Sequence, residues 1–287
     1  MKIKYKIIKI ILIFIINFYF FKIKRELLHE FQKDNNNIPK ISIFLAIYNK
    51  EKYLERSIGC LQEQTLKEIE IIAINDASTD NSLNVLKKMS EKGSRIKIIN
   101  NKKNSGSLYS RAMGILSSKG EYLLSLDPDD RYQAKTNLKY LYNISKKLKV
   151  DIVSFLVIYL PSKMTSKFFT NSNEIIRQPE LYQSLFKSNI LNDYYITNKL
   201  VKREIFLMLS IYLKKYIYGE KWCYYEDNIW IILIYKYANL SIFINKKIYI
   251  SLYIINISII RNIAYANYIN LFLLFNKFLI LKISFYI

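Results

Sequence analysis

The sequence predicts an α/β fold with a mostly parallel sheet flanked by helices. Short runs rich in β-branched and aromatic residues alternate with amphipathic stretches of helical length between residues 41 and 158. Strands separated by helices of this length imply right-handed crossovers, which set the strands parallel in one sheet. Several runs also end in polar side chains, as is typical of a sheet that binds a ligand at the carboxyl ends of its strands.

The elements can be assigned in order from these patterns. The expected strands are 41–47, 70–75, 96–99, 122–126 and 151–158. The expected helices are 50–64, one that follows the polar turn 75–80, then 108–118 and 132–147. Beyond residue 160 the pattern weakens. There we expect an irregular insert over 165–189 with a helix near 179–186, a strand and turn over 195–206, and a helix over 224–237.

Apolar segments flank this region on both sides. Residues 1–23 combine a basic flank with a dense apolar stretch, short for a bilayer span of roughly 17–25 residues, and no small-residue cleavage site follows. We expect an uncleaved signal anchor at 1–23 and a polar stem at 24–39; a cleaved signal or a peripheral helix is the alternative. A globular domain at 40–260 and an apolar C-terminal helix at 261–287 complete the expected organisation.

Composition restricts the chemistry. The 287 residues carry a formal net charge of +21, one histidine, His29, and two cysteines, Cys60 and Cys223. So few soft ligands exclude a zinc site of the usual spacing, and the single histidine argues against Ser-His-Asp or Cys-His mechanisms. Aromatic residues are not interleaved with the basic ones, so we expect no nucleic-acid partner. Carboxylates must therefore carry any acid–base chemistry.

Three carboxylates, Asp127, Asp129 and Asp130, directly follow the apolar run 122–126. Mg²⁺ and Mn²⁺ take oxygen ligands and often bridge carboxylates to phosphates, so one interpretation is a metal–diphosphate site. The other is an acidic turn in which Asp129 and Asp130 cap the next helix.

Earlier strands also end in polar residues. Tyr48 and Asn49 follow the first strand, and Asp76 follows the second. Because the carboxyl ends of parallel strands share one edge of a sheet, these side chains should meet the acidic cluster there. This expected convergence favours the ligand site over a simple turn.

A series of short motifs extends from residue 41 to residue 258. They are Ala46–Tyr53, Gln64–Thr65, Ile74–Ser82, Asn104–Gly106 with Ser110–Gly114, Gly120–Asp130, Asn198–Phe206 and Glu226–Trp230. In this order and at this spacing the motifs resemble the family 2 glycosyltransferases, the nucleotide-diphospho-sugar transferases. The resemblance implies the GT-A fold, a Rossmann-like sheet flanked by helices.

The resemblance implies roles for residues that would bind the donor. Ala46, Tyr48 and Asn49 match the first donor-binding loop. Asp76 matches the acid that contacts the nucleobase, usually uracil, and Arg111 matches a basic residue of the nucleotide pocket.

The resemblance also implies a metal site and a base. Asp127 and Asp129 match the metal-binding Asp-x-Asp motif, with Asp130 beside it, and Asp127 also belongs to the donor site. Asp227 matches the catalytic base of inverting members. A divalent cation would neutralise the charge that develops on the leaving diphosphate, and a carboxylate base would take the acceptor proton.

We therefore expect an enzyme that is metal-dependent, with Mn²⁺ or Mg²⁺, and inverting. It would move a hexose or N-acetylhexosamine from a nucleotide-sugar, preferably a UDP-sugar, to a hydroxyl of a carbohydrate, lipid or protein glycan. The alternative is a catalytically inactive relative that binds nucleotide-sugars as a scaffold. With residues 1–23 as anchor, the protein would be a single-pass membrane protein. It would be a type II Golgi or endoplasmic-reticulum enzyme in a eukaryote, and would lie at the cytoplasmic face of the inner membrane in a bacterium.

Overall fold

The computed structural model describes residues 38–93, 95–166, 173–187, 195–207, 210 and 226–252. The predicted N-terminal anchor, the predicted stem up to residue 37 and the predicted C-terminal helix lie outside these residues. Among the residues described, no helix combines the length and the apolar character that a membrane span needs. The chain divides after Leu252, and all the elements below belong to its first unit.

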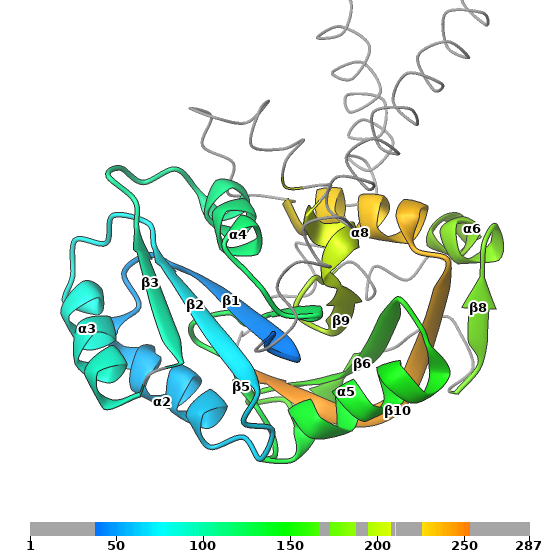
Figure 1. The fold of residues 1–287 in the computed structure, drawn as a ribbon, viewed down its shortest axis with the longest axis horizontal. Coiled ribbons are helices and arrows are strands. Elements are labelled where there is room, and N and C mark those ends of the chain that lie inside the picture. The colour runs from blue at the N-terminus through cyan, green and yellow to red at the C-terminus, as the bar shows by residue number, and fades with distance from the viewer. Residues whose placement is uncertain are drawn as a thin grey trace, which may run out of the picture. The chain divides into compact units, whose positions relative to one another are not determined.

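One sheet runs through this unit, with helices on both faces (Figure 1). Its strands are β1 (Ile41–Ile47), β2 (Ile69–Asn75), β3 (Ile96–Asn100), β4 (Tyr122–Ser125), β5 (Arg131–Tyr132), β6 (Ile152–Tyr159), β7 (Met164–Thr165), β8 (Ile175–Arg177), β9 (Lys199–Lys202) and β10 (Leu240–Ser251). The helices are α2 (Glu51–Gln62), α3 (Ser82–Lys92), α4 (Ser107–Leu116), α5 (Asn137–Leu148), α6 (Glu180–Lys187) and α8 (Glu226–Tyr237). The strand order is β3-β2-β1-β4-β9-β6-β10-β5, with β7 paired to β6 and β8 to β10.

The first half of the sheet has the predicted parallel arrangement. β1 pairs in parallel with β2 and β4, and β2 pairs in parallel with β3. Ile41, Ile43, Phe44 and Leu45 are fully buried in β1, because α2 covers one face of this strand and α4 covers the other (Figure 1). Burial on both faces is the reason that β1 is a continuous apolar run rather than an alternating one.

Beyond β4 the sheet is mixed, so the prediction of a mostly parallel sheet is wrong for this half. β9 lies antiparallel between β4 and β6, and β5 and β8 lie antiparallel to β10. The pairing of β6 with β10 is parallel. β9 is only four residues long, too short for its apolar pattern to indicate its direction.

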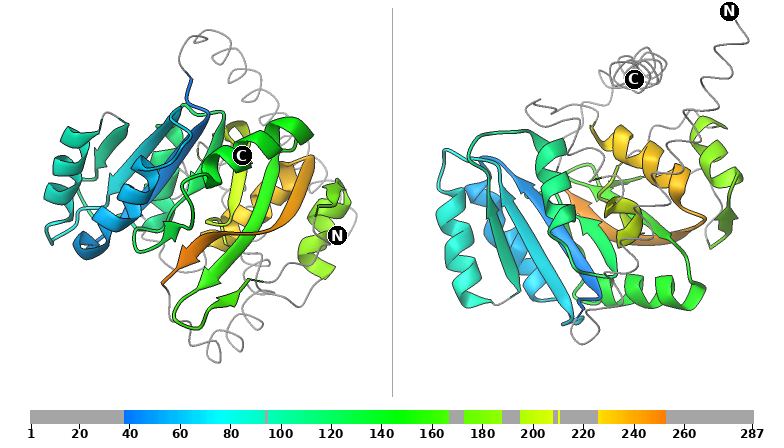
Figure 2. Two further views of the ribbon diagram at one scale, coloured as in Figure 1. Left: turned by 90° about the horizontal axis from the view of Figure 1, so that it is seen from below. Right: turned by 45° about the horizontal axis from the view of Figure 1, so that its top comes forward.

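The strands β5 and β10 were not predicted from the sequence. Arg131–Tyr132 pairs as β5 with the end of β10, so the helix expected to begin at Tyr132 begins at Asn137 instead. β10 runs beside β6 for most of its length, which is seen from below in Figure 2. Register shifts between Ile244 and Lys247 and between Lys247 and Tyr249 interrupt the two-residue alternation that would have identified it.

The parallel strands bring their carboxyl ends to one edge, as predicted. The backbone N–H of Asp76, after β2, donates to the carbonyl of Ile47 at 2.8 Å. On the other side of β1, the N–H of Leu126 donates to the carbonyl of Phe44 at 3.1 Å. The residues that follow β1, β2 and β4 therefore start from neighbouring points at this edge.

Candidate active site

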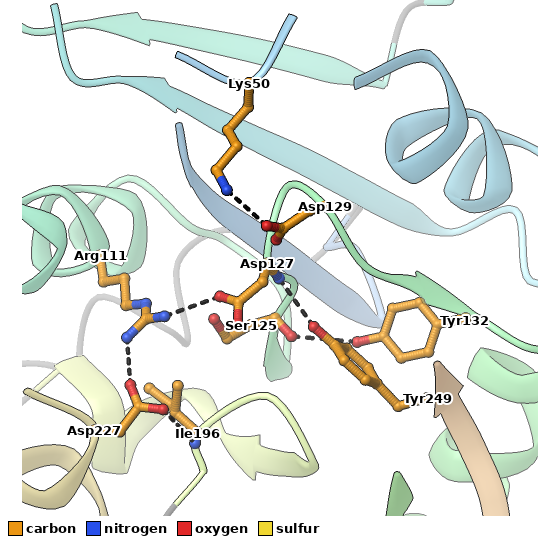
Figure 3. Close-up of polar contacts among 9 residues, drawn as sticks. All are labelled: Lys50, Arg111, Ser125, Asp127, Asp129, Tyr132, Ile196, Asp227 and Tyr249. Atoms are coloured by element: carbon orange, nitrogen blue, oxygen red, sulfur yellow. Dashed lines mark hydrogen bonds and ion pairs between the residues drawn. The ribbon is translucent and has the colours of Figure 1, made fainter. Parts of the chain in front are cut away.

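Arg111 joins the predicted metal-binding loop to the predicted base. Its guanidinium extends from α4 and donates to Asp127 at 2.9 Å and to Asp227, the second residue of α8 (Figure 3). The Arg111 side chain is only 8% exposed. Charge-assisted bonds to two carboxylates compensate for burying this cation.

Asp227 is held from a second side by the chain. Its other carboxylate oxygen accepts a hydrogen bond from the backbone N–H of Ile196 at 3.4 Å, just before β9 (Figure 3). Asp227 lies at the N-terminal end of α8, where the helix dipole favours a negative charge. Its side chain keeps 23% of its surface exposed to solvent.

Asp129 is bound on the opposite flank of the loop, by α2 and the residue before it. The ammonium of Lys50 lies 2.6 Å from the Asp129 carboxylate, and both side chains are about one-third exposed. Arg56 donates to the Asp129 backbone carbonyl. An exposed ion pair of this kind contributes about 0–1 kcal/mol, so a stronger ligand could displace Lys50.

Asp130 faces inward and does not cap a helix. Its residue is 4% exposed, and its carboxylate accepts a hydrogen bond from the backbone N–H of Leu252 at 2.9 Å. The alternative of a helix-capping acidic turn is wrong, because α5 begins only at Asn137, with Thr136 before it as the N-cap residue. Burial, and next the charge of Asp127, raise the pKa of Asp130 to about 7.

This raised pKa predicts a pH-dependent stability. Asp130 is ionised in the unfolded chain above about pH 4, but in the folded protein it releases its proton only near pH 7. The raised pKa therefore stabilises the folded protein fully below about pH 4. This contribution falls as the pH rises from there and is lost once the pH has passed about 7. We expect Asp130→Asn to raise the melting temperature relative to wild type by about 5 °C more at pH 8 than at pH 5. Parallel thermal melts check this, and an equal shift at both pH values would contradict it.

The carboxylate oxygens of the acidic loop are ligands of the kind that a hard cation binds. Asp127 and Asp129 present carboxylates that are 39% and 30% exposed, and carboxylate oxygens are ligands that Mg²⁺ and Mn²⁺ accept. Within the described ranges, no three His, Cys, Asp or Glu side chains gather as a metal-binding group. Asp130 points toward the end of β10, where its carboxylate binds the Leu252 N–H. A metal role for the three aspartates stays a prediction.

Asp76 lies at the same edge but is already heavily bonded. One oxygen accepts from the Asn101 side chain at 2.8 Å and from the N–H of Ser105 at 3.0 Å. The other accepts from the N–H of Gly106 at 2.8 Å, and the residue is 3% exposed. Asp76 therefore holds the loop that leads into α4, and its predicted contact with a nucleobase stays a prediction.

The predicted first donor-binding loop follows β1. Tyr48 is 43% exposed, whereas Ala46 is partly buried within the strand. Asn49 adopts a left-handed conformation with φ of 52° and bonds to Thr79, accepting from its N–H at 2.8 Å and donating to its hydroxyl at 3.1 Å. Asn49 thus ties this loop to the turn after β2.

Sequence reasoning missed the residues that contact the acidic loop from other elements, among them Lys50, Arg56 and Tyr249. Lys50 directly follows Asn49 inside a motif that was recognised, so its position offered a signal. Tyr249 offered none, because it lies in the irregular part of β10. Its hydroxyl accepts a hydrogen bond from the backbone N–H of Asp127 at 3.0 Å (Figure 3).

The sequence matches the family model for glycosyl transferase family 2 over residues 42–208. It is 32% identical over 200 residues to an uncharacterized glycosyltransferase of Haemophilus influenzae, covering 67% of this chain and 60% of that protein. It is 30% identical over 224 residues to a cholesterol galactosyltransferase of Borreliella burgdorferi, covering 73% of this chain and 59% of that protein. The chain thus spans only about 60% of the length of these relatives.

Solved structures show the same fold at lower identity. Residues 1–349 of TarS from S. aureus in complex with UDP match with a TM-score of 0.58 and 22% identity, over 75% of this chain and 60% of that one. The mannosyltransferase PcManGT of Pyrobaculum calidifontis in complex with GDP-Man and Mn²⁺ matches with a TM-score of 0.51 and 13% identity. This match covers 82% of this chain and 64% of that one. The family model covers more than half of the chain, and with the relatives it shows that the protein belongs to glycosyl transferase family 2.

Proposed function

We propose that this protein transfers a sugar from a nucleotide-sugar to an acceptor hydroxyl with inversion at the sugar carbon. The observation that carries the proposal is the position of Arg111, which contacts both Asp127 and Asp227. Arg111 thereby places Asp127, the proposed metal and donor ligand, close to Asp227, the proposed base. An inverting displacement needs these two parts together, because the base acts opposite the leaving diphosphate.

Asp227 is the proposed general base. Its partial exposure lets an acceptor hydroxyl reach it, and the Ile196 N–H and the Arg111 guanidinium fix its orientation. The acceptor oxygen would attack the anomeric carbon while Asp227 takes its proton, and the sugar–phosphate bond would break to release the nucleoside diphosphate. Arg111 would remain between the base and the donor side, where it offsets negative charge.

The proposed cofactor is Mn²⁺ or Mg²⁺. Asp127 and Asp129 are the residues that would hold it, and the bound ion would neutralise the charge of the leaving diphosphate. UDP is the favoured carrier: one relative is named a galactosyltransferase, and TarS has been solved with UDP and with UDP-GlcNAc. The sugar would be a hexose or an N-acetylhexosamine, and the acceptor a carbohydrate, a lipid or a protein glycan.

We also propose that residues 1–23 attach the protein to a membrane. The basic flank and the apolar stretch of that segment support this. Its location would be the cytoplasmic face of the inner membrane in a bacterium, or the Golgi or endoplasmic reticulum in a eukaryote.

Release of UDP with and without metal tests the enzymatic proposal. We expect the full-length protein to release UDP from at least one UDP-hexose or UDP-N-acetylhexosamine when a mixture of glycan and glycolipid acceptors is present. Mn²⁺ or Mg²⁺ should raise the rate at least tenfold over a sample with EDTA. A protein that binds UDP-sugar but releases no UDP with any acceptor would instead support the inactive, scaffolding alternative.

A further inference from the structure

Tyr249 contacts the acidic loop from an element far away in the sequence. It lies near the end of β10, it is 1% exposed, and its hydroxyl accepts a hydrogen bond from the N–H of Asp127 at 3.0 Å.

The end of β10 contacts the acidic loop at a second point. The Asp130 carboxylate accepts a hydrogen bond from the backbone N–H of Leu252, three residues after Tyr249, at 2.9 Å. The end of β10 therefore contacts the loop at two points: the Tyr249 hydroxyl binds the Asp127 N–H, and the Leu252 N–H binds the Asp130 carboxylate. These two contacts form a network that holds both ends of the four-residue loop 127–130, with the partly exposed Asp129 between them.

The opposite flank of the loop is held less firmly. Lys50 and Arg56 bind Asp129 there, but Lys50 is about one-third exposed and Arg56 is exposed. Water competes with such contacts, so each contributes little to stability. A buried polar group that loses its partner is destabilised more, so the contacts to β10 hold the loop more firmly than those to Lys50 and Arg56.

We propose that Tyr249 is a positioning residue that holds Asp127 and Asp129 in the orientation required to bind the metal and the diphosphate. Because Tyr249 is only 1% exposed, it would act through Asp127 rather than by contact with a ligand. It fixes the backbone at Asp127, while the Leu252 N–H holds Asp130 at the other end of the loop. The role of this loop toward metal and diphosphate rests on the proposed function, whereas the contacts themselves do not.

Tyr249→Phe removes the hydroxyl and keeps the ring. The structure offers a matched control in Tyr132, which pairs directly with Tyr249 across β5 and β10. The two rings pack edge to face with centroids 5.6 Å apart, and Tyr132 is 2% exposed. The Tyr132 hydroxyl donates to the carbonyl of Ser125 at 3.4 Å (Figure 3). The hydrogen bond to the Asp127 N–H is made by Tyr249 and not by Tyr132.

Hydrogen exchange of the free full-length protein tests the network first. In Tyr249→Phe we expect the peptide containing residues 126–131 to exchange about 10-fold faster than in wild type. In Tyr132→Phe the same peptide should exchange within about twofold of wild type. Equal exchange in the two variants would overturn the proposal, because the hydroxyl of Tyr249 would then not hold the loop.

Calorimetric titration with UDP in the presence of Mn²⁺ tests the functional part. We expect the dissociation constant of UDP to rise about 10-fold in Tyr249→Phe, with little change in Tyr132→Phe. Faster exchange with unchanged UDP binding would overturn the positioning role. Failure of the proposed function looks different, because wild type and both variants would then all fail to bind UDP, while the exchange experiment would still decide whether Tyr249 holds the loop.

Discussion

Asp227→Asn is expected to reduce sugar transfer by about 10²–10⁴-fold, because it removes the carboxylate proposed to take the acceptor proton. The substitution keeps the shape of the side chain. The amide oxygen can still accept from Arg111 or from the N–H of Ile196, so the surrounding contacts need not collapse. Binding of UDP in the presence of Mn²⁺ should stay within about threefold of wild type, because the base acts on the acceptor and not on the nucleotide.

Comparison of kcat/KM with the UDP dissociation constant separates the two effects. A matched control is Glu68→Gln, which removes a carboxylate from the exposed ion pair with Lys40, next to the start of β1. That variant should retain full transfer. If Asp227→Asn retained it as well, the base would have to be another group. If UDP binding fell in parallel with transfer, Asp227 would belong to the donor side.

The elements of the first half of the sheet were predictable because local patterns determine them. β1, β2 and β4 are buried apolar runs, and each is followed by polar residues that the shared edge brings together. The order of motifs along the chain predicted Asp76, Asp127 and Asp227 as site residues without any knowledge of distances, and that assignment stays a prediction.

The contacts that complete the site were not predictable in the same way. Arg111 meets Asp227 only because α8 packs beside α4, and the two residues are 116 positions apart in the sequence. Tyr249 reaches the acidic loop across 122 positions, from a strand whose register shifts hide its alternation. The inward direction of Asp130 likewise depends on where β10 ends. Each of these contacts follows from tertiary packing, about which the local pattern carries no information.

Asp76→Asn is expected to weaken both the fold and the nucleotide site, since the buried carboxylate of Asp76 accepts three hydrogen bonds. An asparagine oxygen can still accept from Asn101 and Ser105, but its NH₂ group then faces the N–H of Gly106. A buried donor left without an acceptor costs about 1–3 kcal/mol. For a domain of this size the melting temperature should fall by about 2–4 °C for each kcal/mol lost.

The effect on binding follows from the position of Gly106, which is the N-cap residue of α4, the helix that carries Arg111. A displaced loop at 104–106 would move the start of this helix, so the affinity for UDP should fall about 10-fold or more in Asp76→Asn. Asn101→Ala, which removes only one donor to the same carboxylate, is the control and should lower stability and affinity less. If Asp76→Asn lost UDP affinity with an unchanged melting temperature, Asp76 would act on the nucleobase directly. A loss of both in proportion would mean that it acts by holding the loop in front of α4.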